Sequence, residues 1–293
     1  MNTKEMMQIA LDLAGLTEMP SDTSISVEGE DITNVLAGID MGTAELALAR
    51  QLGYDCVFRH HNLTPAMGKL GYLVAEDHYK KMVKNGVPVN VAQKLVEHRK
   101  RSTEIMFHAN NFDGAPSVAR LLNMPFLGIH TPADLLGERA VEAKVAEVMV
   151  EKENPTVQDL MDRILTIREF KEAPEGQKPA IWVGSPESYS GKVLVEFSGG
   201  LSAELDEVKA YIDAGIGTFV CMHMEGDIVK ALQEDNRCNV IVTGHMASDS
   251  VGMNRIMDEW EKHGIKGAVA RGPSVNIAAG TSTGGITNQM PGR

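Results

Sequence analysis

Segments with the apolar pattern of buried strands alternate with helix-like segments along most of the chain, and this alternation limits the available folds. Short runs rich in valine, isoleucine and phenylalanine are each followed by a stretch with apolar residues at helical spacing. Parallel strands need such crossovers, so the order predicts an α/β protein with helices flanking mainly parallel or mixed sheets. The expected strands are 35–40, 55–61, 105–108, 126–130, 192–200, 218–223 and 239–245.

Two stretches interrupt this order and predict two α/β domains. Residues 135–175 are helix-rich and highly charged, and 172–180 resembles a linker. We expect 1–134 together with 239–293 to form one domain, with a metal site in the cleft at the carboxyl ends of its strands. Residues 135–238 would form the second domain. The Gly/Ser/Thr-rich tail, 275–293, is predicted to be weakly ordered.

Bulk composition excludes several classes of function. The 293 residues carry a net charge of −12, which argues against a nucleic-acid partner because such proteins usually present a basic face. Three cysteines without a CxxC pair predict a reducing compartment. The first residues lack the apolar block of a signal peptide, and no window approaches the length of a membrane span. We therefore expect a soluble, cytoplasmic protein with no membrane partner.

Most of the histidines share one kind of position. In α/β sheets, ligands and catalytic groups gather at the carboxyl ends of strands. A single partly buried histidine with a backbone partner is common there, but histidines at five strand ends favour a shared role. Six of the nine histidines end expected strands, and these are His60, His61, His108, His130, His223 and His245.

Two short patterns have the spacing of metal ligands. Neighbours in a regular strand point to opposite faces, so His60 and His61 can share a target only if the strand ends there. They would then reach one ion or two, although two surface histidines in a turn fit equally well. If a helix begins near His245, Asp249 lies on the same face one turn later. Asp249 could instead cap that helix.

Asp113 follows the expected strand at 105–108 and could bridge two metals with its two oxygens, although an Asx-turn is the stronger local interpretation. Mixed imidazole and carboxylate ligands suit zinc, iron, manganese or cobalt. Five ligands are too many for one catalytic zinc, but they suit two divalent ions that share a carboxylate. The candidate ligands are His60, His61, Asp113, His245 and Asp249.

Three stretches in this order resemble the Nif-three-like family over about 31–266: GIDMGTAELALARQLGYDCVFRHHN, NNFDGAPSVARLLNMP and VIVTGHMASDS. The resemblance implies a dinuclear metal centre, a toroidal homohexamer and a GTP cyclohydrolase I type 2-like activity. It also implies that His60 and His61 each bind one metal, that Asp113 bridges them and that His245 is the late histidine ligand. Asp249 stands where the family more often has glutamate.

The chain departs from the family pattern near the expected pocket. The family's HHP is HHN here, with Pro65 three places later. The early Trp-Asp-Asn stretch is replaced by SDTSISVEGED at 21–31. These changes affect the expected pocket wall, and therefore the substrate, more than the metal ligands.

The expected function is hydrolysis of a small, nucleotide-like substrate with two divalent metal ions per chain. His130, His223 and Glu225 are candidates for general acid/base work or for supporting the ligands. No Walker loop and no GxGxxG after a strand supports a nucleotide directly. The alternative is a non-catalytic metal-binding scaffold or a protein-interaction partner, in which the coordination shell would be closed.

Overall fold

The computed structural model describes residues 1–67, 70–197 and 203–269, which form two compact units. The first unit comprises Met1–Gly68, Phe107–Gly137 and the chain from Asp249 onward; the second comprises Lys69–Met106 and Glu138–Ser248. The division differs from the one expected, and the boundary expected after residue 134 falls after Gly137. Residues 69–106 belong to the second unit, and the last boundary follows Ser248 instead of residue 238. The tail at 275–293 lies outside the described residues.

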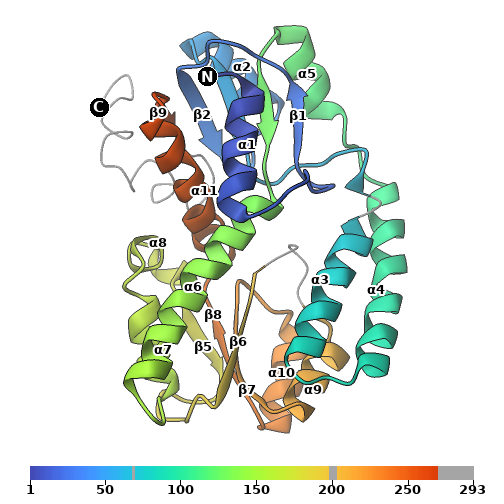
Figure 1. The fold of residues 1–293 in the computed structure, drawn as a ribbon, viewed down its shortest axis with the longest axis vertical. Helices are drawn as coiled ribbons and strands as arrows, with labels where there is room; N and C mark the ends of the chain where they lie inside the picture. Colours follow the sequence, from blue (N-terminus) through green and yellow to red (C-terminus); the bar gives the residue numbers. More distant parts are fainter. Residues whose placement is uncertain (68–69, 198–202, 270–293) are drawn as a thin grey trace. The chain divides into compact units, whose positions relative to one another are not determined.

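The first unit is built on a five-stranded mixed sheet (Figure 1). Only the β1–β4 pairing is antiparallel, so β2, β3, β4 and β9 run in one direction. The strand order across the sheet is β1 (Ser24–Val27), β4 (Phe126–Gly128), β3 (Cys56–Arg59), β2 (Asn34–Gly38), β9 (Lys266–Val269). Its helices are α1 (Thr3–Ala14), α2 (Thr43–Leu52), α5 (Gly114–Leu122), the start of α6 (Thr131–Glu151) and most of α11 (His245–Lys262).

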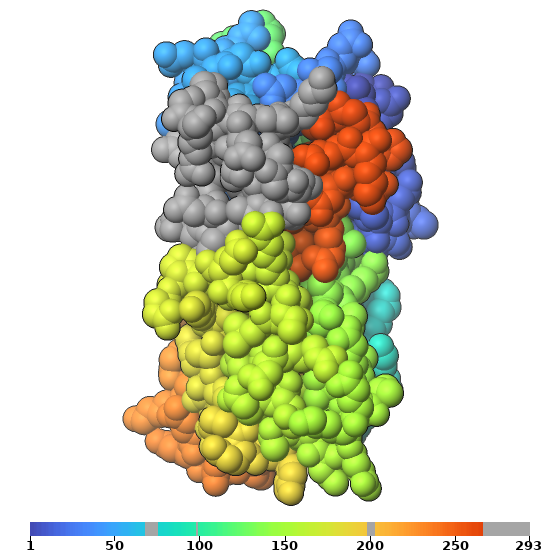
Figure 2. Space-filling view, turned by 90° about the vertical axis from the view of Figure 1, so that its left-hand side faces the viewer, coloured from blue at the N-terminus to red at the C-terminus, as the bar shows by residue number. Residues whose placement is uncertain are grey.

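The second unit has a four-stranded mixed sheet. Figure 2 shows one face of this unit, on which the residues coloured green to yellow include α6, α7 (Val157–Ile164) and α8 (Arg168–Lys171). The strand order is β5 (Ala180–Val183), β8 (Asn239–Val242), β7 (Ile216–Cys221), β6 (Lys192–Glu196), with β5 antiparallel to β8. Its helices are α3 (Leu70–Lys84), most of α4 (Val89–His108), the rest of α6, α7 (Val157–Ile164), α8 (Arg168–Lys171), the 3-10 turn Glu175–Gln177, α9 (Leu205–Asp213) and α10 (Gly226–Asp235).

One expected strand is wrong. Residues 105–108 form the last turn of α4, a helix of 20 residues, so His108 ends a helix and not a strand. The apolar run that suggested a strand is not buried, since Ile105 and Met106 are 58% and 46% exposed. A short apolar run does not by itself distinguish a strand from a helix, and here the helix that starts at Val89 continues through it.

The core of the first unit fixes α11 against the sheet. Trp260 is fully buried, and its ring meets Phe58 of β3 edge to face at 5.1 Å between centroids. Its indole Nε1 donates to the Met6 carbonyl on α1 at 2.9 Å. The large ring therefore packs and also satisfies its only donor, which holds the last turn of α11 against β3 and α1.

Among the helices of the described residues, none combines the length and hydropathy that a membrane span requires.

Candidate metal centre

The end of β3 turns His60 and His61 toward one region. The strand ends at Arg59, and the next two backbone N–H groups both donate to the Ile39 carbonyl, at 3.2 Å and 2.9 Å. Regular alternation of side chains is therefore broken at the two histidines. Arg59 is buried and donates from Nε and Nη2 to the side-chain oxygen of Asn62 at 3.0 Å and 2.7 Å, which fixes the turn after the pair.

Asn62, the residue that departs from the family's proline, is a structural part of this turn. Its Nδ2 donates to the Asp22 carbonyl at 3.1 Å and to the Ser24 hydroxyl at 2.9 Å. Asn62 also lies so close to Gly128 of β4 that any Cβ there would collide with its amide. The HHN sequence thus ties the end of β3 to β1 and β4.

A glycine brings the first turn of α6 close to α11. A Cβ on Gly252 of α11 would collide with the Ala133 carbonyl of α6, so only glycine permits this approach. Asp134 follows Ala133, and Asp249 lies three residues before Gly252. The two carboxylates, 2% and 0% exposed, therefore enter the same buried region from two helices.

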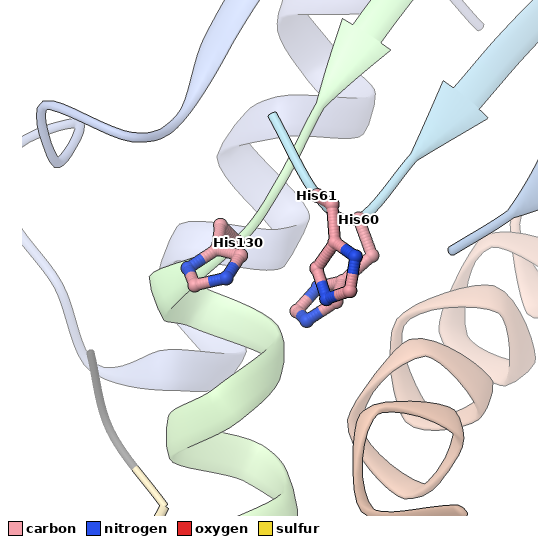
Figure 3. Close-up of side chains that lie close together, drawn as sticks. All are labelled: His60, His61 and His130. Carbon is pink, nitrogen blue, oxygen red and sulfur yellow. The ribbon is translucent and has the colours of Figure 1, made fainter. Parts of the chain in front are cut away.

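Three histidines present the same ring atom to this region, where Figure 3 shows the rings close together. Each Nδ1 lies within hydrogen-bond distance of an oxygen that can only accept, so in the neutral ring Nδ1 carries the proton and Nε2 carries none. Metal-binding histidines are usually oriented in this way. The acceptors are the Ile129 carbonyl for His60 (3.1 Å), Asp40 for His61 (2.8 Å) and Asp22 for His130 (2.9 Å).

The distances between imidazole and carboxylate fit a shared ion better than direct hydrogen bonds. His60 Nε2 lies 3.2 Å from Asp134 Oδ1 and 3.5 Å from Asp249 Oδ1, and His61 Nε2 lies 3.3 Å from Asp249 Oδ2. Two ligand atoms about 2.1 Å from one ion, at a tetrahedral angle, are about 3.4 Å apart. His60 Nε2 and Asp134 Oδ1 are both buried and have no hydrogen-bond partner.

Two groups of side chains in this unit have one ligand atom each within 4.8 Å of the others: His60, His61 and His130, and His60, Asp134 and Asp249. Imidazole and carboxylate donors suit zinc, iron, manganese or cobalt. An atom such as His60 Nε2, buried opposite two carboxylate oxygens, needs either a proton or a cation between it and them. The cluster is therefore able to bind metal.

The buried carboxylates of the cluster also shift the pKa values of its histidines. Burial lowers the pKa of His60, but the carboxylates of Asp249 and Asp134 outweigh burial and raise the pKa well above 6.5. Burial likewise opposes the effect of Asp134 and Asp22 on His130, whose pKa is nevertheless raised. The pKa of Asp22 is lowered, because hydrogen bonds led by His130 outweigh its complete burial. Protons and metal ions thus compete for the same ring atoms.

The remaining residues predicted from the sequence are described within their own units. Asp113 is N-terminal to α5, with a side chain 48% exposed, and none of the groups just described includes it. His245 begins α11 one turn before Asp249 and belongs to the second unit. In that unit its ring lies 4.9 Å from the ring of His223, which follows β7. Glu225 is exposed at the N-cap of α10.

Three residues of the centre were absent from the sequence prediction. Asp134 lies four residues after His130, the spacing that drew attention to His245 and Asp249, so this signal was available. Asp40 closes an expected strand, another position at which acids can be sought. Asp22 stands in a stretch with no periodic pattern, and only the tertiary fold brings it to His130.

The fold and the cluster together define an α/β protein with a His/Asp group able to bind metal, and comparison with known proteins agrees with the fold. A solved NIF3 superfamily protein from Sphaerobacter thermophilus is 35% identical, covers 92% of this chain and 98% of its own, and superposes with a TM-score of 0.86. The chain belongs to the NIF3 superfamily. The resemblance to the Nif-three-like family and the α/β fold class are thereby confirmed.

More distant structures share the fold only. Reduced HcgD from Methanocaldococcus jannaschii is 14% identical over 92% of this chain and 97% of its own, with a TM-score of 0.53. The protein ybgI, described as of unknown function, is 15% identical over 94% and 100%, with a TM-score of 0.51.

The C-terminal part of the chain has a second similarity. The model of the asparaginase family matches residues 218–293, which is less than half of the chain. An isoaspartyl peptidase from Salmonella typhimurium is 54% identical over 50 residues, which is 17% of this chain and 15% of the peptidase. The chain thus spans a small part of that curated relative. Residues 218–269 of the matched range include most of β7 and all of α10, β8, α11 and β9.

Proposed function

We propose that the protein holds two divalent ions at this cluster and uses them to hydrolyse a small, nucleotide-like substrate. The observation that carries the proposal is the position of Asp249. This buried carboxylate turns one oxygen toward His60 Nε2 and the other toward His61 Nε2, at 3.5 Å and 3.3 Å. A carboxylate that faces two separately oriented imidazoles has the arrangement of a ligand shared between two ions.

The proposed ligands are His60, His61 and Asp249, with His245 supported by its place one turn before Asp249 on α11. Asp40 and the Ile129 carbonyl would hold the rings of His61 and His60 in the tautomer whose Nε2 carries no proton. Divalent zinc, iron, manganese or cobalt bound here would supply Lewis acidity and lower the pKa of a coordinated water. The charge of Asp249 would partly offset that of the ions.

His223 and Glu225 remain proposals for acid/base work, supported by their place at the carboxyl end of β7. Replacing a histidine that has this role would change the pH profile of turnover without changing the amount of bound metal. His223→Ala is therefore expected to lower kcat without loss of metal.

The first test is elemental analysis of the purified protein, coupled to hydrolysis assays on nucleotides and phosphate esters with added Mn²⁺, Zn²⁺ or Fe²⁺. We expect two metal equivalents per chain, and metal-dependent turnover that Asp249→Asn abolishes. His263→Ala is the matched control, because this histidine is 53% exposed at the end of the same helix. Turnover unaffected by Asp249→Asn would overturn the hydrolase proposal.

A non-catalytic metal-binding scaffold is the second proposal, and the same measurements separate the two. Two metal equivalents without turnover in any metal form would favour the scaffold. The toroidal homohexamer rests on the family resemblance alone, and light scattering coupled to size-exclusion chromatography measures it directly.

A further inference from the structure

A second His-x-x-x-Asp pair enters the centre from α6. After β4, His130 immediately precedes α6 and Asp134 lies in the first turn of that helix. After β8, His245 is the first residue of α11 and Asp249 follows one turn later. Residues four apart on a helix lie on one face, so each pair offers an imidazole and a carboxylate from one helical turn.

Asp134 has the burial and surroundings of a ligand. Its side chain is 2% exposed, and its Oδ1 lies 3.2 Å from His60 Nε2 without a hydrogen-bond partner. His60 is completely buried, and its Nδ1 is already used by the Ile129 carbonyl, so only Nε2 can face Asp134. When the ring is neutral, both buried atoms carry lone pairs, so they require a proton or a cation between them.

Asp113 has the opposite surroundings. Both its oxygens accept from Arg120 Nη2, at 2.6 Å and 2.8 Å, and its Oδ2 also accepts from the Ser117 hydroxyl at 2.6 Å. All three residues lie at or in α5, and the Arg120 and Asp113 side chains are about half exposed, at 51% and 48%. Asp113 thus forms a surface ion pair with Arg120 at the start of α5.

We propose that Asp134, and not Asp113, supplies the second carboxylate of the metal centre, where it holds one ion together with His60 and Asp249. This inference rests on the proposed metal function and specifies its ligand set. A second carboxylate beside the shared Asp249 brings the charge of the group closer to neutral, which lowers the cost of keeping divalent ions against side chains 0% to 2% exposed.

The assignment also gives His130 a place. Its ring stacks on His60 at 4.6 Å between centroids and 15° between planes, and Asp22 holds its Nδ1. One ring nitrogen of His130 lies within 4.8 Å of those of His60 and His61. His130 therefore borders the same ion site as Asp134, with which it shares a helical turn.

The test compares Asp134→Asn with Asp113→Asn, a matched pair of isosteric changes that each remove one charge. Metal per chain is measured by elemental analysis after dialysis, and Co²⁺ affinity by calorimetry and by the visible absorption of the bound ion. We expect Asp134→Asn to lose one of two equivalents, or to bind that ion about 100-fold more weakly. Asp113→Asn should keep both equivalents and the Co²⁺ spectrum of the parent protein.

Each other outcome has a definite meaning. If Asp134→Asn keeps two equivalents with parental affinity, or if Asp113→Asn also loses an equivalent, the assignment is overturned while the metal function stands. If the parent protein binds no metal, the function itself fails. Should Asp134→Asn not fold, Asp134→Glu retains the carboxylate and is expected to bind Co²⁺ with a changed absorption spectrum; an unchanged spectrum would also overturn the assignment.

Discussion

Both units bury a histidine among carboxylates, but the acids have different partners. In the first unit, His60 faces Asp134 and Asp249, and the nearby acids Asp22 and Asp40 hold further histidines. In the second unit, His78 lies 3.3 Å from Glu196 and 3.8 Å from Glu207, and it is 2% exposed.

The second cluster contains its own permanent cations. Arg99 forms an ion pair with Glu207 and also lies 3.3 Å from His78 Nδ1, and Lys81 lies 2.9 Å from Glu138. Arginine and lysine neutralise the acids directly and need no added ion. In the first cluster, histidines face the acids with lone pairs, so neutralisation requires protons or metal. A buried His/Asp or His/Glu cluster is therefore a metal candidate only when its cations are absent or titratable.

The strongest test of this difference is Glu207→Gln in the second unit. Glutamine keeps the length and can still accept from the Glu204 backbone N–H at the start of α9, but it leaves buried Arg99 without its ion-pair partner Glu207. We expect the free energy of unfolding to fall by about 3–5 kcal/mol. Denaturant unfolding with metal chelated measures this, and the metal content of the folded variant should not change.

Glu234→Gln is the matched control, because this glutamate is exposed on α10. A change within about 0.5 kcal/mol is expected there. A loss of metal in Glu207→Gln would contradict the division of roles between the two clusters.

The sequence predicted the first cluster in part, for reasons that particular residues illustrate. His60 and His61 could be predicted as ligands because they are adjacent in the sequence and end a strand, and both features are local. Asp249 could be placed because helical spacing relates it to His245. Asp22 could not, since its contact with His130 joins residues 108 positions apart. Asn62, a departure from the family pattern, proved to hold the turn that presents the histidines.

The assignment of Asp113 shows the limit of a motif. The stretch NNFDGAP matches the family loosely, and the expected strand before it is part of α4. When a segment expected to be a strand is part of a helix, the residues after it lie in a different place from the one expected. Sequence spacing alone does not reveal this difference. The alternation of strands and helices, in contrast, survives small boundary errors, which is why the fold class was predicted correctly although the strand expected before Asp113 was not.

A smaller effect is expected from Asp40→Asn, which loosens a ligand without removing it. Asp40 is 58% exposed and holds His61 Nδ1 at 2.8 Å. Asparagine can still accept a hydrogen bond but without charge, so the ring becomes a weaker ligand. We expect metal affinity to fall by about 10-fold, with unfolding of the metal-free protein unchanged. Calorimetric titration measures this; a parental affinity would show that Asp40 does not orient the ring for metal binding.

The smallest effect concerns the pH dependence of the second cluster. Burial lowers the pKa of His78, but Glu196 and Glu207 outweigh burial and the opposing charge of Arg99, so the pKa lies above 6.5. A raised pKa means that the folded protein holds the proton more tightly than the unfolded chain. The stabilisation is therefore complete below pH 6.5 and is lost as the pH rises through the folded pKa.

His78→Gln removes this titration, and metal-saturated protein keeps the first cluster from titrating alongside it. The difference in unfolding free energy between parent and variant should shrink from about pH 6.5 upward, with a slope of at most about 1.4 kcal/mol per pH unit for one proton. Glu207, whose pKa is lowered because His78 and Arg99 outweigh burial, acts in a separate window as the pH falls below 4.5. A difference that stays constant across the alkaline window would mean that Arg99 and Lys81 alone neutralise the cluster, and that His78 has no share in it.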